Sequence, residues 1–205
     1  MLATLLAAVI NAGASLYTVG SIPVDNPLGA SFTGTYDQAP PGTTVGNLTV
    51  TLDVNGGYNG YLYAYLVAPN GTLVSLLNLP GVTGGNPYGY SGSGLNVTLS
   101  DAGTGGIDNA PETAGAVLTG TYQAAGALSG FSGSAVDGTW TLFFADLGQG
   151  GGQPELTGWS LDITVVPEPV NVALTFFGIA SIGIGVVRVY CGSRKQTPQS
   201  LQTIA

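Results

Sequence analysis

The sequence predicts an all-β body, a sandwich or jelly roll, followed by a single C-terminal transmembrane helix. Two observations predict the body. Several segments alternate apolar and polar residues with the period of two that a strand with one buried face requires, and 34 glycines among 205 residues suit many tight turns. The helix is predicted by an apolar run that stands directly before all three basic residues of the chain.

The N-terminus has the form of a secretory signal peptide. Residues 2–10 are almost wholly apolar, and Ala12-Gly13-Ala14 has the small-x-small pattern of a cleavage site. The run is short and no basic residue precedes it, so a buried strand or helix is the alternative. We expect residues 1–14 to be a signal peptide that is removed near Ala14.

Alternation identifies four strands of the body. They are LTVTLDV, LNVTL, TWTLFFAD and LTGWSLDITV, and in each a set of apolar side chains falls on one face while the intervening residues fall on the other. Each segment therefore fits a sheet that buries one face. The side chains that we expect in the core are Leu48, Val50, Leu52, Val54, Leu95, Val97, Leu99, Trp140, Leu142, Phe144, Trp159, Leu161, Ile163 and Val165.

A hairpin is predicted within YLYAYLVAPNGTLVSLL. Pro69-Asn70-Gly71 separates its two apolar runs, and Asn-Gly accepts the positive φ that a tight hairpin turn needs. No window before Val170 has a helical period, so we place residues 15–165 in one β-sandwich. Most tyrosines and both tryptophans are then core or cross-strand residues, with a ligand-stacking role as the alternative.

Charge and composition exclude several classes of function. Eleven acids, three bases and no histidine give a net charge of −8, and such a surface repels phosphate, so we expect no nucleic-acid binding. Without histidine, the chain lacks the commonest residue of Ser–His–Asp and Cys–His catalysis and of zinc sites. No specific pair of carboxylates points to a glycosidase. We therefore expect a protein that is not an enzyme.

Four acids are candidate calcium ligands. Asp101, Asp108 and Glu112 lie in the loop SDAGTGGIDNAPE, and Asp146 ends the predicted strand that contains Trp140. Oxygen-rich loops suit calcium, which takes six to eight oxygen ligands in irregular geometry. The spacing of the four acids matches no dedicated calcium repeat and favours the alternative, in which they are solvated loop acids.

The C-terminal segment predicts a membrane span. Residues 170–187 would measure about 27 Å as a helix, close to the ~30 Å thickness of a hydrocarbon core. Arg188, Arg194 and Lys195 follow this run and favour the cytoplasmic side, which places the body outside. A buried core helix is the alternative, but it does not explain the position of the bases. A polar tail, residues 196–205, completes the chain.

The body resembles the P domain, also called Homo B, of kexin-like and bacterial subtilisin-type proteases. The resemblance covers roughly residues 17–165 and rests on IPVDNP, LTVTLDV, YLYAYLVAPNGTLVSLL, LNVTLSDAG and LSGFSGSAVDGTWTLFFADLGQGGGQPELTGWSLDI. Its most specific part is the ending, G-T-W-T-L-x-x-x-D, a polar loop, and L-x-G-W-S-L. The resemblance implies a non-catalytic β-jelly roll that stabilises or targets a partner. Some such domains bind calcium.

The C-terminus, residues 166–195, resembles a PEP-CTERM sorting signal. Its three parts stand in the order of that signal: the motif Val166-Pro167-Glu168-Pro169, the apolar helix of residues 170–187, and the basic cluster of residues 188–195. The resemblance implies export in a Gram-negative bacterium, processing by an exosortase near the Pro-Glu-Pro motif, and association with extracellular polysaccharide and biofilm. The sparse basic cluster and the polar tail depart from the usual signal.

Two functions follow as expectations. The first is an exported, non-catalytic protein of the cell surface or extracellular matrix, anchored in the inner membrane before processing and contacting polysaccharide or another protein. The alternative is a detached accessory or binding module that assists a separately encoded subtilisin-type protease or other hydrolase. The sequence identifies no ligand for the β-sandwich.

Overall fold

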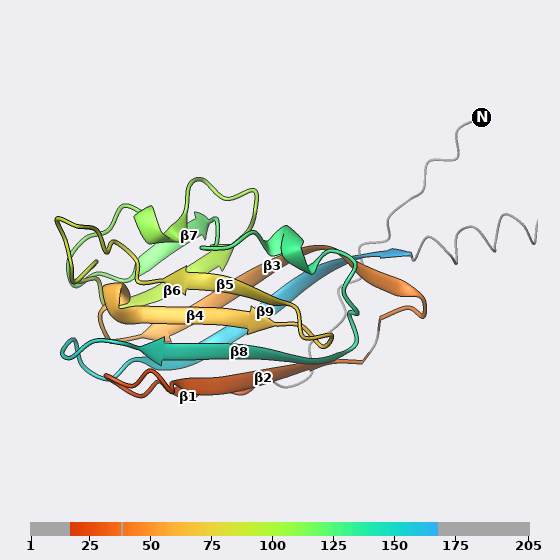
Figure 1. Cartoon of the computed structure of the whole chain (residues 1–205), viewed down its shortest axis with the longest axis horizontal. Helices are drawn as coiled ribbons and strands as arrows, with labels where there is room; N and C mark the ends of the chain where they lie inside the picture. Colours follow the sequence, from red (N-terminus) through yellow and green to blue (C-terminus); the bar gives the residue numbers. More distant parts are fainter. Residues whose placement is uncertain (1–16, 38, 168–205) are drawn as a thin grey trace, which may run out of the picture. The chain divides into compact units, whose positions relative to one another are not determined.

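The computed structural model describes residues 17–37 and 39–167, which form an all-β body of two sheets (Figure 1). The first compact unit of the chain ends at Val166. Three 3-10 turns are the helical elements of the described residues: η1 (Asn59–Tyr61), η2 (Ile107–Asn109) and η3 (Leu128–Phe131). The strands are β1 (Gly20–Ser21), β2 (Ala30–Tyr36), β3 (Thr43–Asn55), β4 (Leu62–Val67), β5 (Leu73–Asn78), β6 (Gly94–Leu99), β7 (Leu118–Tyr122), β8 (Gly138–Asp146) and β9 (Glu155–Pro167).

The two sheets lie one behind the other. One has the strand order β2-β8-β4-β5 and faces the viewer in Figure 1, and the other has the order β1-β9-β3-β6-β7. The pairs β1–β9, β2–β8, β3–β6, β4–β5 and β4–β8 are antiparallel, and β6 and β7 run parallel. Strands distant in sequence are thus neighbours, because β8 lies between β2 and β4 and β9 lies between β1 and β3.

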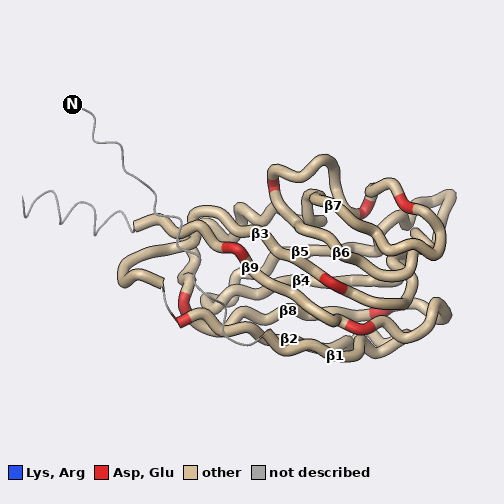
Figure 2. The backbone as a smooth tube through the Cα atoms, turned by 180° about the vertical axis from the view of Figure 1, so that it is seen from behind, with Lys and Arg blue, Asp and Glu red and all other residues tan. Residues whose placement is uncertain are grey.

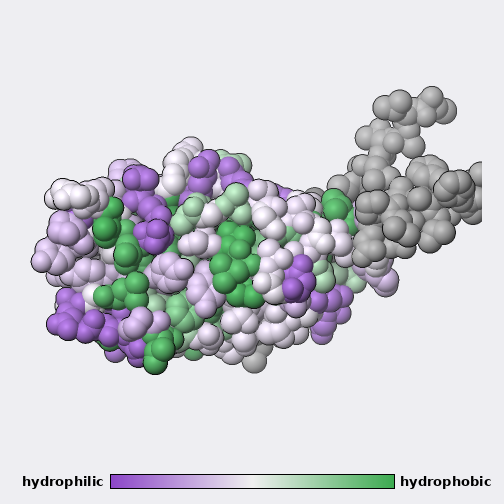
Figure 3. Space-filling model, viewed as in Figure 1, coloured by the Kyte–Doolittle hydropathy of each residue, from purple (hydrophilic) through white to green (hydrophobic). Residues whose placement is uncertain are grey.

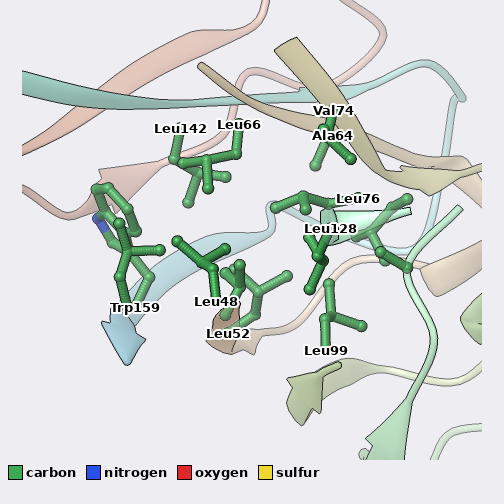
Figure 4. Close-up of a cluster of buried hydrophobic side chains, with 14 of the residues drawn as sticks. Leu48, Leu52, Ala64, Leu66, Val74, Leu76, Leu99, Leu128, Leu142 and Trp159 are labelled. Carbon is green, nitrogen blue, oxygen red and sulfur yellow. The ribbon is translucent and has the colours of Figure 1, made fainter. Parts of the chain in front are cut away.

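The core fills the space between the sheets. Figure 4 shows side chains of both sheets pointing toward one another, with Leu66 and Leu142 from one sheet facing Leu48 and Trp159 from the other. All fourteen side chains that the sequence predicts in the core are buried. Trp140 is fully buried, and its indole nitrogen donates a hydrogen bond to the carbonyl oxygen of Val136 at 3.0 Å.

The strands predicted by alternation are confirmed, and so is the hairpin. Gly71 has a φ of +85° in the turn between β4 and β5, where positive φ is needed. Three strands, the two-residue β1 and the longer β2 and β7, were not predicted. The sequences of β2 and β7, ASFTGTY and LTGTY, are short and interrupted by glycine, so their alternation is weak. Pairing with β9, β8 and β6 holds β1, β2 and β7, respectively, in the sheets.

Several predictions concern parts of the chain outside the described residues. They are the signal peptide, the transmembrane helix, Glu168 and Pro169 of the sorting motif, and Arg188, Arg194 and Lys195 of the basic cluster. Val166 and Pro167 of the motif close β9 and are exposed. Within residues 17–37 and 39–167, no helix has the length and apolar character needed to cross a bilayer.

Candidate functional site

Three of the predicted calcium ligands hold backbone amides of separate segments. Asp101 accepts hydrogen bonds from the amides of Leu128 and Ser129, both at 2.7 Å, and so fixes the start of η3. Asp108 accepts one from the amide at the end of β5, at 3.0 Å. Glu112 accepts hydrogen bonds from the Gly92 amide and from the side-chain amide of Asn59, the first residue of η1. These bonds satisfy the carboxylates locally.

Burial raises the pKa of Asp108 and of Glu112, and their hydrogen-bond donors oppose the shift. Asp146, the fourth predicted ligand, lies at the end of β8 and binds the amide of Gly148 at 3.0 Å. No three acidic or cysteine side chains among residues 17–37 and 39–167 are grouped so as to hold a metal ion. The four predicted acids therefore do not form one common site.

The described residues form an open groove at one end of the sheet β2-β8-β4-β5. Two hollows of about 310 and 540 Å³ adjoin there and share Leu79 and Leu147 in their walls. We call this region the aromatic groove because most of its large side chains are rings. Its aromatic residues are Tyr61, Tyr63, Tyr65, Tyr88 and Phe143.

Strand alternation places the rings of the groove on the outer face. Leu62, Ala64 and Leu66 of β4 point into the core, so Tyr63 and Tyr65 between them point outward and are partly exposed. The same alternation in β8 turns one phenylalanine, residue 143, outward between two buried neighbours. Both strands thus contribute to the core with one face and to the groove with the other.

Cross-strand pairing brings two of these rings together. Tyr65 lies directly opposite Phe143 in the β4–β8 register, and their rings stack with centroids 4.6 Å apart and an interplanar angle of 11°. Tyr63 meets Tyr65 edge to face at 6.1 Å. Such pairs hold one another in place and add to sheet stability. The register of the β4–β5 pairing shifts between Ala64 and Tyr65.

Loops from three parts of the sequence form the walls of the groove. Pro27 and Leu28 close one side, residues 79–88 another, and the loop after β8 the third. Leu79 has a φ of +54°, which is unusual for a bulky residue and costs free energy, although its amide is hydrogen-bonded to Leu62. Strained residues of this kind concentrate at functional sites.

Glycine brings the loop after β8 against the rings. A Cβ atom on Gly148 would lie 2.3 Å from Cγ of Tyr61, so only glycine fits beside this ring. The amide of Leu147 donates a hydrogen bond to the carbonyl oxygen of Tyr61 at 2.9 Å, which fixes the loop to η1. The glycine-rich segment DLGQGGGQPE is therefore shaped to pack against tyrosines.

The groove is uncharged within an acidic body. None of the described residues that line the two hollows is charged, and their polar groups are amides, tyrosine hydroxyls and backbone. Figure 3 shows hydrophobic side chains gathered in groups on the face that carries β4, β5 and β8. In Figure 2 acidic residues are spread over the described tube, which contains no Lys or Arg.

This arrangement suits the binding of a neutral ligand with both apolar and hydroxyl groups. Ring faces and edges take the apolar surface, while tyrosine hydroxyls and the Asn78 side chain offer donors and acceptors. Sequence analysis left ligand stacking as the alternative role for tyrosines and did not locate the groove. The signal was present in YLYAY, where Tyr61, Tyr63 and Tyr65 occupy the outward positions of a predicted strand.

Comparison with known proteins adds little to this geometry. No protein-family model matches the chain, and no curated protein matches it. Among solved structures, the chain is similar to one described as the complex of the Aeromonas sobria serine protease (ASP) with the chaperone ORF2. The identity is 18% and the TM-score 0.41, over 76% of this chain and 27% of that one. A likeness of this extent assigns neither a fold family nor a function.

Proposed function

We propose that the β-sandwich is a non-catalytic binding module that holds an uncharged polysaccharide in the aromatic groove. The observation that carries the proposal is the cluster of Tyr63, Tyr65 and Phe143 on the outer sheet face, beside two adjoining hollows without a charged wall. Sugar rings offer apolar C–H faces and hydroxyl edges, which aromatic rings and amide or hydroxyl groups bind together.

Charge favours a neutral glycan over an anionic one. The ten acidic residues of the described segments have no Lys or Arg beside them in those segments, so an anionic chain approaching the groove meets repulsion only. The open form of the two hollows suits a polymer that passes through, because neither hollow needs to enclose the whole ligand.

The proposed setting is the outside of a Gram-negative cell. The signal-peptide pattern, the motif at residues 166–169, the apolar run and the basic cluster together support export and exosortase processing of a PEP-CTERM-like signal. A polysaccharide-binding body released or held at the cell surface would join that surface to the extracellular matrix. The resemblance to P domains supports a jelly-roll sandwich as the finer description of the fold.

Binding to a panel of oligosaccharides tests the proposed function. We expect the full-length chain to bind at least one neutral hexasaccharide among cello-, xylo-, chito- and malto-oligosaccharides, and to bind oligogalacturonate less well. A preference for oligogalacturonate would contradict the role of charge. Binding of a subtilisin-type protease domain, with no binding to any glycan, would instead favour the accessory module.

A further inference from the structure

A second site is indicated by the carboxyl group of Asp146. This side chain continues the inward-facing series of β8 and is fully buried. One carboxylate oxygen, Oδ1, accepts the hydrogen bond of the Gly148 amide at 3.0 Å, whereas Oδ2 is buried without a hydrogen-bond partner among the described residues. A buried carboxylate oxygen without a partner costs free energy, so the group needs a counter-charge or a proton.

The sequence supplies no positive charge near this carboxylate along the chain. No Lys, Arg or His precedes Arg188. The ionisable side chains of the described residues are therefore aspartates, glutamates and tyrosines. The usual partner of a buried carboxylate, an arginine or lysine, is therefore missing from the whole body. Neutralisation must come from the solvent, as a cation or a proton.

A second acidic residue lies in a loop that is tied to the end of β8, where Asp146 lies. The Asn26 amide donates a hydrogen bond to the carbonyl oxygen of Asp146 at 3.0 Å, which ties the loop before β2 to the end of β8. Asp25, the preceding residue, has a φ of +49° and accepts a hydrogen bond from the Gln149 side chain at 2.6 Å.

Asp25 has a left-handed backbone in the loop that is hydrogen-bonded to the end of β8, and a cation bound there would neutralise the buried carboxylate of Asp146. We propose that Asp25 and Asp146 bind one calcium ion, which fastens the loop before β2 to the loop after β8. Calcium suits the place because it accepts carboxylate and backbone oxygens in irregular geometry, whereas magnesium requires near-ideal octahedral geometry and usually keeps several waters. The proposed pair keeps only Asp146 of the four acids that the sequence predicts as ligands.

The position of this pair links the ion to the aromatic groove. Pro27 and Leu28 follow Asp25 directly and line one hollow, and Leu147 follows Asp146 and lines both. An ion between the two carboxylates would hold two walls of the groove at a fixed separation. The site is independent of which ligand the groove takes, so its test does not require a glycan.

Thermal unfolding of the full-length chain after removal of metal by a chelator tests the proposal. We expect Ca²⁺ at about a hundred times its dissociation constant to raise Tm by about 5–10 °C, and isothermal titration to give one site. The Asp25→Asn variant should lose this shift. Asparagine tolerates a left-handed backbone, so the exposed loop should keep its conformation in Asp25→Asn. The test therefore does not depend on Asp146→Asn, which removes a buried charge and can fail to fold.

Asp53→Asn is the matched control because Asp53 is an exposed acid on β3 and the substitution changes the charge equally. It should keep the full calcium shift, and Mg²⁺ at the same concentration should give a much smaller one. Equal shifts with Mg²⁺ and Ca²⁺, or a calcium shift that survives Asp25→Asn, would overturn the proposal and leave a proton as the neutralising group.

Discussion

Replacing Gly148 by alanine should close part of the aromatic groove. The new Cβ would lie 2.3, 2.4 and 2.6 Å from three ring atoms of Tyr61. Ordinary contacts are 3.4–4 Å, so the ring or the loop must move by about 1 Å or more. Overpacking of this kind costs about 1–3 kcal/mol, which corresponds to a fall in Tm of roughly 2–12 °C for a domain of this size.

The assay combines thermal unfolding with binding of the neutral oligosaccharide that the wild-type chain prefers. We expect affinity to fall about tenfold or more, since the displaced ring forms part of the groove. Gly84→Ala is the matched control: Gly84 lies in the loop that also supplies Tyr88, and a Cβ there would meet no atom within 4 Å. Unchanged affinity in Gly148→Ala, or an equal loss in Gly84→Ala, would refute the assignment of the groove.

Three further predictions follow. Trp140→Ala should lower the free energy of unfolding by about 3–5 kcal/mol in chemical denaturation because the ring is fully buried; a loss below ~1 kcal/mol would show that the ring does not support the core. Asp108, Glu112 and Asp146 have raised pKa values, so the folded state binds more protons than the unfolded one. Stability of the calcium-free chain should therefore fall as pH rises above the ordinary values of 3.8 and 4.5 toward 7, and a Tm that instead falls on mild acidification would contradict this. In a host with a matching exosortase, Glu168→Ala should leave the precursor unprocessed, and mass spectrometry of intact wild-type chains ending at Ala205 would count against sorting.

Local patterns were sufficient to predict most strands. In β3, β8 and β9 a buried face alternates with an exposed one over many residues, so period two is visible without any tertiary information. The turn at Asn70-Gly71 is equally local, because the position that needs a positive φ is itself a glycine. β7 needs its partner strand: LTGTY has one buried residue at each end and becomes a strand through parallel pairing with β6.

The sites depend on contacts between distant segments and were harder to predict. Asp101 was considered as a metal ligand, yet its carboxylate holds the start of η3, twenty-seven residues away. Asp25 was not considered, because nothing local relates it to Asp146, which lies 121 residues later; the link is a backbone hydrogen bond. The groove likewise joins Leu28, Leu79 and Leu147. The acids and tyrosines are visible in the sequence, but the topology of the sheets determines which of these side chains lie close together.

Comparison of Tyr65→Ala with Leu73→Ala in glycan binding tests the central claim most directly. Tyr65 stacks on Phe143 within the groove. Leu73 is an exposed apolar residue at the first position of β5, whereas the groove is lined by Asn78 at the last position of that strand. By titration calorimetry with the preferred neutral hexasaccharide, Tyr65→Ala should weaken binding about tenfold or more, while Leu73→Ala should bind as the wild type does. Equal affinities for all three chains would contradict the proposal that the aromatic groove is the binding site.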